Sequence, residues 1–295
     1  MPACEIGLGS DGLQQPASAS SQHEQPATGD SFCDMRIVSL CPSLTELVFD
    51  LGHGHELVGR TKFCIHPADR VGAVEKVGGT KNPKIDRIVD LAPDIVLLNE
   101  EENRREDAEA LERAGVRCHV SFPHTALETA EMVRSIATAI DARDQGERIA
   151  RDIEARHERV KRAAAGRTPV RFAYLIWREP WMTVNADTFV SALLIDAGGQ
   201  NVFAGRAERY PVVTSEELGA AQTDVVLLST EPFPFKPSHA DELARLSGIA
   251  RERIQIVDGE LLSWHGSRTP DGIDYAERVI AAAGNLAPAG EHRRG

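Results

Sequence analysis

The chain has 295 residues, of which 42% are hydrophobic and 26% charged, a composition typical of soluble globular proteins with one large or two ordinary domains. A formal charge of −12 argues against nucleic-acid binding and against docking on an anionic membrane. No apolar run approaches the roughly 18 residues of a membrane-spanning helix, so membrane insertion is not expected. Five scattered cysteines without a CxxC pair indicate neither a disulfide framework nor a structural zinc site, and they favour a reducing compartment.

Residues 1–34 are rich in Ser, Gln, Ala, Pro and Gly and are predicted to be a disordered tail. They contain neither the basic nor the apolar region of a secretory signal, which predicts a cytoplasmic location. Met35 begins the first strand-like run and is a candidate start site, and a misassigned start would leave a periplasmic or cell-surface location as the alternative. A second disordered tail is predicted at residues 285–295.

A first α/β lobe is predicted over residues 35–124. Its apolar runs "RIVSL", "DIVLL" and "RCHVSF" are typical of strands buried in a parallel sheet, and helical segments alternate with them. The strands are expected at residues 36–40, 94–98 and 117–122, and the helices at residues 43–52, 84–91 and 102–114.

Residues 125–166 carry no strand pattern and are predicted to be connecting helices. "ALETAEMVRSIATAIDA" is typical of an amphipathic helix, and the highly charged "QGERIARDIEARHERVKRAAAG" predicts a second one that ends at Gly166. Because a helix of about 20 residues spans roughly 30 Å, this segment is expected to join two lobes rigidly.

Residues 167–284 repeat the pattern of the first lobe. "PDIVLLNEE" at residues 93–101 matches "TDVVLLSTE" at residues 223–231, and "RIVSL" is echoed by "RFAYL" at residues 171–175. The sequence therefore predicts two similar α/β lobes with parallel sheets, joined by a long rigid helix. A ligand cleft is expected between the lobes, where loops follow the carboxyl ends of the strands.

Four segments of the first lobe are expected at the cleft. In "CPSLTE", Ser43 and Glu46 form the pattern of a capping box, so they are predicted to be structural, while Cys41 faces the cleft. In "TKFCIHP", Cys64 and His66 are two candidate metal ligands, which is weak evidence for a metal site. The favoured prediction is a buried thiol and a cleft-lining imidazole. "GGTKNP" is a glycine turn that can approach a ligand, and "NEEEN" is predicted to be a solvated, acidic helix start.

The second lobe concentrates aromatic and basic residues in the loops expected at the cleft. All three tryptophans, three arginines and a histidine fall there, although aromatic residues make up only 5% of the chain. Loops rich in Trp, Tyr and Arg are typical of recognition surfaces. In the same lobe, Thr214 and Glu217 form the pattern of a second capping box.

These segments together give one candidate ligand-binding set, with no catalytic residues and no metal ligands assigned. Its members are Cys41, Phe63, Cys64, His66 and Thr80 in the first lobe, and Trp177, Arg178, Trp181, Arg209, Tyr210, Phe233, Trp264, His265 and Arg268 in the second. The nucleophile-elbow, phosphate-loop, dinucleotide and zinc-protease motifs do not occur, so an enzyme is not expected. The catalytic alternative pairs Cys64 with His66 or His265 as nucleophile and base.

Over about residues 35–284 the chain resembles the cobalamin- and iron-siderophore-binding substrate-binding proteins of ABC importers, the helical-backbone metal receptors. The matching text is "RIVSLCPSLTELVFDLG", "LVGRTKFCIHP", "VGGTKNPKIDRIVDLAPDIVLLNEEENR", "YPVVTSEEL" and "DVVLLS". The resemblance implies a two-lobed fold with little lobe closure and a bulky metal chelate bound without chemistry. A corrinoid such as cobalamin is the first choice of ligand, and a ferric siderophore or haem the second; no intrinsic cofactor is expected.

The resemblance also implies docking on an ABC permease through one surface glutamate in each lobe. Glu216 fits this role in the second lobe, because Glu217 takes the capping position. In the first lobe the matching place in "NRRED" holds Arg105, with Glu106 beside it. The chain is expected to be a monomer. The alternative function is a cytoplasmic enzyme or accessory protein that acts on a corrinoid or metal cofactor through a reactive Cys or His.

Overall fold

The structure, a computed structural model, describes residues 35–285, which belong to one compact unit of the chain. The disordered tail predicted for residues 1–34, and all but the first residue of the tail predicted for 285–295, lie outside the described residues. No helix in the described range is both long enough and apolar enough to cross a membrane.

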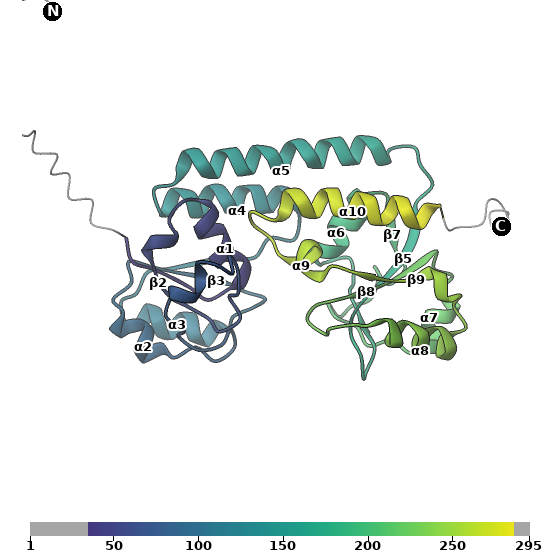
Figure 1. The fold of residues 1–295 in the computed structure, drawn as a ribbon, viewed down its shortest axis with the longest axis horizontal. Coiled ribbons are helices and arrows are strands. Elements are labelled where there is room, and N and C mark those ends of the chain that lie inside the picture. Colours follow the sequence, from purple (N-terminus) through teal and green to yellow (C-terminus); the bar gives the residue numbers. More distant parts are fainter. Residues whose placement is uncertain (1–34, 286–295) are drawn as a thin grey trace, which may run out of the picture. The chain divides into compact units, whose positions relative to one another are not determined.

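The first lobe is built on a four-stranded parallel sheet in the order β2-β1-β3-β4 (Figure 1). Every residue of the central strand β3 is buried, as expected for an apolar run covered on both faces. The strands are β1 Ile37–Ser39, β2 Leu57–Arg60, β3 Ile95–Asn99 and β4 Cys118–Ser121. The helices are α1 Pro42–Asp50, α2 Ile85–Asp90 and α3 Arg105–Arg113, with short 3-10 turns at Gly54–Glu56 and Val71–Ala73.

The second lobe repeats this arrangement. Its parallel strands lie in the order β7-β5-β8-β9, and β6 adds an antiparallel pairing at the end of β5. The strands are β5 Val170–Trp177, β6 Met182–Thr183, β7 Gly199–Asn201, β8 Val225–Ser229 and β9 Ile254–Val257. The helices are α6 Phe189–Asp196, α7 Ser215–Ala220, α8 Pro237–Ser247, α9 Gly259–Ser263 and α10 Thr269–Gly284, with a 3-10 turn at Arg251–Arg253. The equal strand order confirms the predicted pair of similar α/β lobes.

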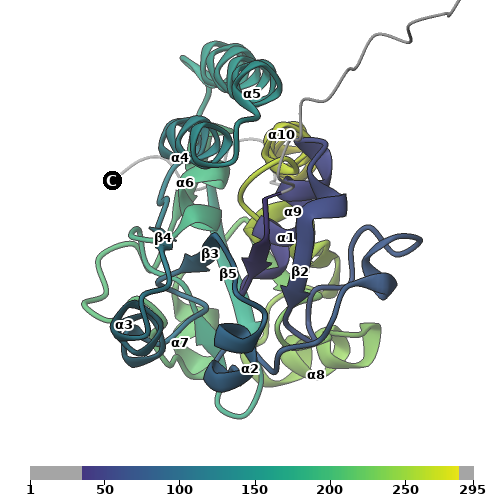
Figure 2. The ribbon, with the colours of Figure 1, turned by 90° about the vertical axis from the view of Figure 1, so that its left-hand side faces the viewer.

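A layer of three helices joins the lobes (Figures 1 and 2). Helices α4 (Ala126–Ala139) and α5 (Arg143–Ala164) pack on each other, and α10 packs against both. Arg134 of α4 reaches Glu147 and Glu154 of α5 at 2.7 and 2.5 Å. Arg159 of α5 pairs with Glu277 of α10 at 2.7 Å. At 1.5 Å per residue, the 22 residues of α5 extend over about 33 Å.

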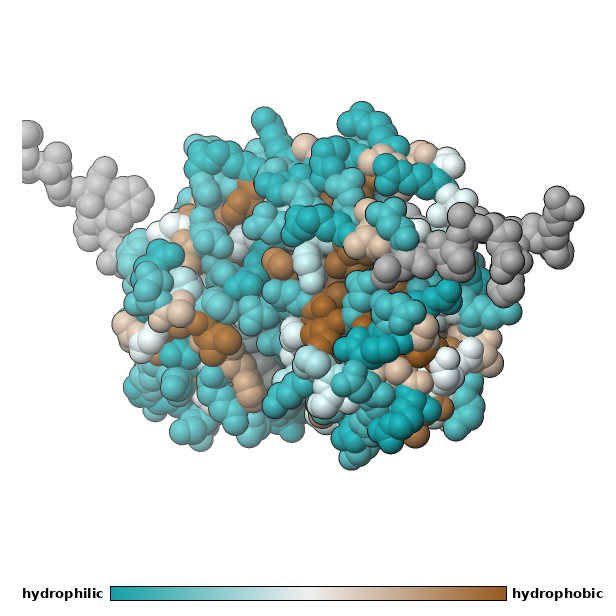
Figure 3. Space-filling model, turned by 45° about the vertical axis from the view of Figure 1, so that its right-hand side comes forward, coloured by the Kyte–Doolittle hydropathy of each residue, from teal (hydrophilic) through white to brown (hydrophobic). Residues whose placement is uncertain are grey.

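The largest hydrophobic core runs through both lobes and the helices that join them. It contains Ile37 and Leu97 of the first lobe, Val133 and Ile153 of α4 and α5, and Phe172 of the second lobe. The exterior is mostly hydrophilic on the face in Figure 3, with apolar residues in separate patches. Opening the lobes widely would disturb this shared core, whose interior is packed like a solid.

Gly146, in the first turn of α5, lies at the contact with α4. A Cβ added there would lie 2.2 Å from Cβ of Ala137. We expect Gly146→Ala to lower the free energy of unfolding by about 2 kcal/mol, because overpacking of up to about 3 kcal/mol outweighs a helix-propensity gain of about 1 kcal/mol. Urea unfolding measures the change. Gly205→Ala is the control, since its Cβ would meet nothing within 4 Å; equal stability of the two variants would argue against this close contact.

Candidate functional site

A cavity of about 290 Å³ lies between the lobes, at the carboxyl ends of β1, β3, β5 and β8. This is the edge at which α/β folds bind ligands. The first lobe contributes Cys41, Pro42, Ser43, Asn99, Glu101 and Glu102. The second lobe contributes Tyr174, Ile176, Val184, Thr188, Phe189, Val190, Tyr210, Glu231, Pro232, Ser263, Trp264 and His265.

His265 bridges the two lobes beside the cavity and is only 8% exposed. Its Nε2 lies 2.8 Å from Nδ2 of Asn99, and its Nδ1 lies 2.9 Å from Oγ of Ser43. The Asn99 amide has a fixed orientation, because its Oδ1 accepts from the backbone N–H of Glu101 (3.0 Å) and its Nδ2 donates to the Ser121 carbonyl (3.0 Å). Asn99 therefore donates to Nε2, and the ring proton lies on Nδ1 and is donated to Ser43.

Burial keeps this histidine neutral and the adjacent thiol protonated. Desolvation lowers the pKa of His265 to about 4. The pKa of Cys41 is raised to about 12, first by burial and then by the nearby negative charge of Glu102. Neither group therefore changes charge near neutral pH.

Carboxyl groups from both lobes face the cavity. Burial raises the pKa values of Glu102 and Glu231. Glu231 accepts a hydrogen bond of 2.9 Å from the indole Nε1 of Trp264. The same indole lies under the Arg268 guanidinium, 4.9 Å from the ring centroid, and has the imidazole of His66 at its edge, at 5.5 Å. These contacts hold the Trp264 ring in one orientation.

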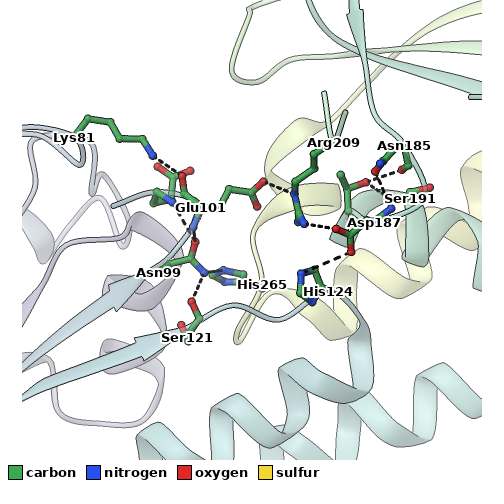
Figure 4. A network of polar contacts seen from close by, with 12 residues as sticks. Lys81, Asn99, Glu101, Ser121, His124, Asn185, Asp187, Ser191, Arg209 and His265 are labelled. Atoms are coloured by element: carbon green, nitrogen blue, oxygen red, sulfur yellow. Dashed lines mark hydrogen bonds and ion pairs between the residues drawn. The ribbon is translucent and has the colours of Figure 1, made fainter. Parts of the chain in front are cut away.

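Ion pairs tie the lobes together around the cavity. Arg268 of the second lobe binds Glu46 of α1 at 3.0 Å and Glu260 of its own lobe at 2.7 Å. Arg209 of the second lobe binds Glu101 of the first at 3.2 Å and Asp187 of its own lobe at 3.1 Å (Figure 4). Each arginine bridges an acidic group of one lobe to an acidic group of the other.

Four of the predicted binding residues line the cavity: Cys41, Tyr210, Trp264 and His265. Trp177 and Trp181 do not. Trp177 is 41% exposed and packs edge-on against Phe233, while Trp181 stacks on Phe235 at 6.0 Å. The lining residues of β5 are Tyr174 and Ile176. Arg178 pairs with Glu242 of α8 at 2.8 Å.

The remaining predicted residues lie behind or beside the cavity lining. Cys64 is fully buried and lies 3.0 Å from Oγ1 of Thr45, while Phe63, one residue before it, is 50% exposed. Thr80 is buried, and its carbonyl accepts from Asn103. His66 lies 3.2 Å from Glu260.

Two predictions about local structure were wrong. Cys41, not Ser43, is the N-cap of α1, and no side chain caps that helix. Ser43 and Glu46 instead bind His265 and Arg268 of the other lobe. The segment "NEEEN" is not a helix start: α3 begins at Arg105, and Glu101 and Glu102 line the cavity instead. The capping box of Thr214 and Glu217 is confirmed.

Three residues at the start of α6 also line the cavity but were not predicted from the sequence, namely Thr188, Phe189 and Val190. They follow the β5–β6 hairpin, whereas the second-lobe loops predicted to bind ligand follow parallel strands. Glu231 lies directly after β8, in the loop that also holds the predicted residue Phe233. Within residues 35–285 no group of three or more His, Cys, Asp and Glu side chains is arranged to hold a metal ion.

Comparisons with known proteins give a consistent result. The sequence pattern of the periplasmic binding protein family matches residues 37–254. A vitamin B12-binding protein of Vibrio parahaemolyticus is 29% identical over 238 residues, which cover 81% of this chain and 86% of that protein.

Solved structures agree with this match. The periplasmic heme-binding protein RhuT of Roseiflexus sp. RS-1 has a TM-score of 0.74 at 25% identity, covering 86% of this chain and 99% of that one. The periplasmic vitamin B12 binding protein of Vibrio cholerae has a TM-score of 0.73 at 22% identity, covering 84% and 97%, and shares the fold.

These matches contradict the cytoplasmic location expected from the N-terminal residues. The matched family and both similar structures are described as periplasmic. The expectation depended on the composition of residues 1–34, which lie outside the described residues, and on scattered cysteines. Residues 1–34 lie outside the range that carries the family pattern, and the three cysteines inside it, Cys41, Cys64 and Cys118, do not by themselves define a compartment.

Proposed function

Because the chain belongs to the periplasmic binding protein family, we propose that it binds a bulky metal chelate between its lobes without chemically changing it. A corrinoid is the first choice of ligand, before haem or a ferric siderophore. The observation that carries the proposal is the interlobe cavity, which presents Tyr210, Trp264 and Phe189 beside hydrogen-bonding groups of both lobes. Aromatic walls with a few polar groups suit a flat macrocycle with polar substituents.

The order of ligands follows from relatives and from charge. Relatives that align over most of this chain are named vitamin B12-binding proteins. Similar solved structures are named for vitamin B12 or for heme. The cavity lining contains Glu101, Glu102 and Glu231 and no arginine or lysine. A carboxylate-bearing ligand such as haem would therefore enter an acidic cavity, which favours the corrinoid.

The polar groups of the cavity support binding rather than catalysis. The Ser43 hydroxyl accepts the His265 proton, so His265 is not oriented to remove a proton from Ser43. Burial raises the pKa values of Cys41 and Cys64, which keeps both as thiols, whereas the thiolate is the nucleophilic form. The alternative with Cys64 as nucleophile also lacks access, since that side chain is fully buried.

Titration of the purified chain with cyanocobalamin, hemin and a ferric siderophore tests the proposal. Calorimetry and quenching of tryptophan fluorescence are expected to report saturable one-to-one binding of cyanocobalamin. The ligand should be recovered unchanged after prolonged incubation. Flat titrations with all three ligands would reject the proposal, and turnover of a bound chelate would restore the enzymatic alternative.

Docking on an ABC permease forms the second part of the proposal, with Glu216 exposed in the first turn of α7. Backbone N–H groups at this helix start lower the pKa of Glu216 and keep it charged. Helix α7 precedes β8 as α2 precedes β3, and aligning "TDVVLL" with "PDIVLL" places Asp86 opposite Glu216. Asp86 is exposed in the first turn of α2, so the repeat favours it over Glu106 of α3 as the acidic contact of the first lobe.

We expect Asp86→Ala and Glu216→Ala each to weaken association with the cognate permease by about tenfold, while ligand affinity changes less than about twofold. Surface plasmon resonance against the permease in lipid nanodiscs measures the first quantity, and calorimetry the second. Glu106→Ala, measured alongside, separates the two candidates for the first lobe. If Glu106→Ala weakens association with the permease more than Asp86→Ala does, Glu106 of α3 is the acidic contact of the first lobe.

A further inference from the structure

The cavity offers an unusual balance of hydrogen-bonding groups. Within the described residues, the carboxylate of Glu102 has no hydrogen-bond partner, and only one oxygen of Glu231 has one, the Trp264 indole. Both side chains therefore present acceptor oxygens. Ser43 supplies the opposite polarity: its oxygen takes the proton of His265 Nδ1, so its own hydrogen is left to donate. The Sγ atom of Cys41 lies 3.4 Å from Oγ of Ser43 and is only a weak acceptor for that hydrogen.

The two arginines near the cavity are paired with carboxylates, whereas Lys81 has a neutral partner. Lys81 donates to the carbonyl of Glu101 at 2.6 Å, and Arg209 binds the side chain of Glu101 and Asp187. Arg268 is shared between Glu46 and Glu260. None of these three cations lines the cavity, although within the described residues Nη2 of Arg209 is buried without a hydrogen-bond partner. The lining therefore supplies carboxylates and no cation to balance an anionic ligand.

We propose that the cavity selects chelates whose periphery carries carboxamides over those that carry carboxylates, with Glu102 and Glu231 as acceptors and Ser43 as a donor. This inference rests on the proposed function and specifies its ligand class. A primary carboxamide has N–H donors for the two carboxylates and a carbonyl oxygen for the hydroxyl. A carboxylate has no donor to offer and adds a like charge, which weakens its binding beside the two glutamates.

The titration of the two glutamates gives this selection a pH dependence. The charged groups around Glu102 are Lys81 and Glu101. Around Glu231 they are Glu260, Asp258 and Glu102. Burial already raises the pKa values of Glu102 and Glu231. A bound anion raises them further by like-charge repulsion, so its binding is accompanied by proton uptake at these carboxyl groups. Carboxylate ligands are therefore bound more tightly as the pH falls.

A matched pair of ligands tests the proposal: cyanocobalamin, and the monocarboxylic acids formed from it by hydrolysis of single peripheral amides. These differ by one charge and have nearly the same shape. At pH 7.5 the acids are expected to bind about tenfold more weakly than the amide to the wild-type protein. In the double variant Glu102→Gln with Glu231→Gln the difference is expected to fall below about threefold, since amide side chains do not repel a carboxylate.

Controls separate this effect from general loss of charge or folding. The variant Glu131→Gln with Glu252→Gln removes two exposed glutamates that do not line the cavity, and it should keep the tenfold difference. Thermal unfolding of both variants checks that they fold. If the Gln variant of the cavity fails to fold, the two single variants are measured instead, each with a partial loss of selectivity.

The outcomes distinguish the two proposals. Equal binding of amide and acid by the wild-type protein, or hemin bound as tightly as cyanocobalamin, overturns the charge selection and leaves chelate binding intact. An unchanged tenfold difference in the cavity variant also overturns it. Failure of the wild-type protein to bind cyanocobalamin, its acids and hemin overturns both proposals. As a further readout, affinity for the acids should rise between pH 7.5 and 6 more steeply in the wild type than in the Gln variant.

Discussion

Replacing Trp264 with alanine is expected to weaken binding of the chelate by about 30-fold or more. Trp264 lines the cavity and is held by three contacts, to Glu231, Arg268 and His66. An aromatic side chain that is fixed before binding loses little conformational entropy when the ligand arrives. Truncation of such residues commonly costs at least about 2 kcal/mol, and about 1.4 kcal/mol corresponds to a factor of ten in affinity.

Isothermal titration calorimetry is the appropriate measurement, because the variant lacks the indole that would report by fluorescence. Trp264→Phe keeps an aromatic ring but loses the indole N–H that donates to Glu231, so it should lie between wild type and Trp264→Ala. The matched controls are Trp177→Ala and Trp181→Ala, which remove tryptophans outside the cavity lining. We expect less than about threefold weakening in both, since truncated residues without ligand contact have small effects on affinity. If either control loses as much affinity as Trp264→Ala, the ligand binds instead at the aromatic residues around Phe233, namely Trp177 and Phe235.

The fold could be predicted from the sequence because its signals are local and occur twice. Buried parallel strands are short apolar runs bounded by turns, and the run at 94–98 differs from β3 by a single residue at each end. The repeat of "PDIVLLNEE" in "TDVVLLSTE" then indicated a second lobe of the same order. The helical connection followed from two long segments without any strand pattern.

The lining of the cavity is harder to predict than the fold, because long-range contacts decide which side chains face it. Strand β5 continues to Trp177, beyond the predicted end at residue 175. Successive residues of a strand point to opposite faces, so Ile176 faces the cavity and Trp177 does not. No local feature of the aromatic-rich segment indicated that the strand would continue.

The acidic segment after β3 illustrates the same limit. Asn103 donates to the carbonyls of Leu40 and Thr80 at 3.0 and 3.1 Å, and its Oδ1 accepts from the backbone of Asn99 at 2.9 Å. These bonds shape residues 99–103 as a turn, which places Glu101 and Glu102 at the cavity. From the sequence alone the same residues match the acidic start of a helix, because their partners are 23 and 63 residues away.

His265 joins the lobes through buried hydrogen bonds to Asn99 and Ser43. Replacing it with leucine is expected to lower the free energy of unfolding at pH 7 by about 2–5 kcal/mol. The variant leaves an N–H of Asn99 and the oxygen of Ser43 without their partner in a buried setting. Each unsatisfied buried group costs about 1–3 kcal/mol. Urea unfolding measures the loss. His55→Leu, at an exposed position in the 3-10 turn Gly54–Glu56, is the control and should change stability by less than about 1 kcal/mol.

The pH dependence of that loss tests the protonation state assigned to His265. Its pKa is lowered from an ordinary 6.5 to about 4 in the folded chain, so between these values the unfolded chain binds one more proton than the folded chain. Wild-type stability therefore falls as the pH drops through this window, by up to about 3 kcal/mol at about 1.36 kcal/mol per pKa unit. His265→Leu lacks this dependence, so the stability difference between wild type and variant should narrow by about that amount between pH 7 and pH 4. Carboxyl groups that titrate in the same range are present in both proteins and cancel in the comparison. If the stability difference between wild type and variant stays constant from pH 7 to pH 4, the buried imidazole takes up its proton as readily as an exposed one. That result would contradict a neutral His265 between Asn99 and Ser43.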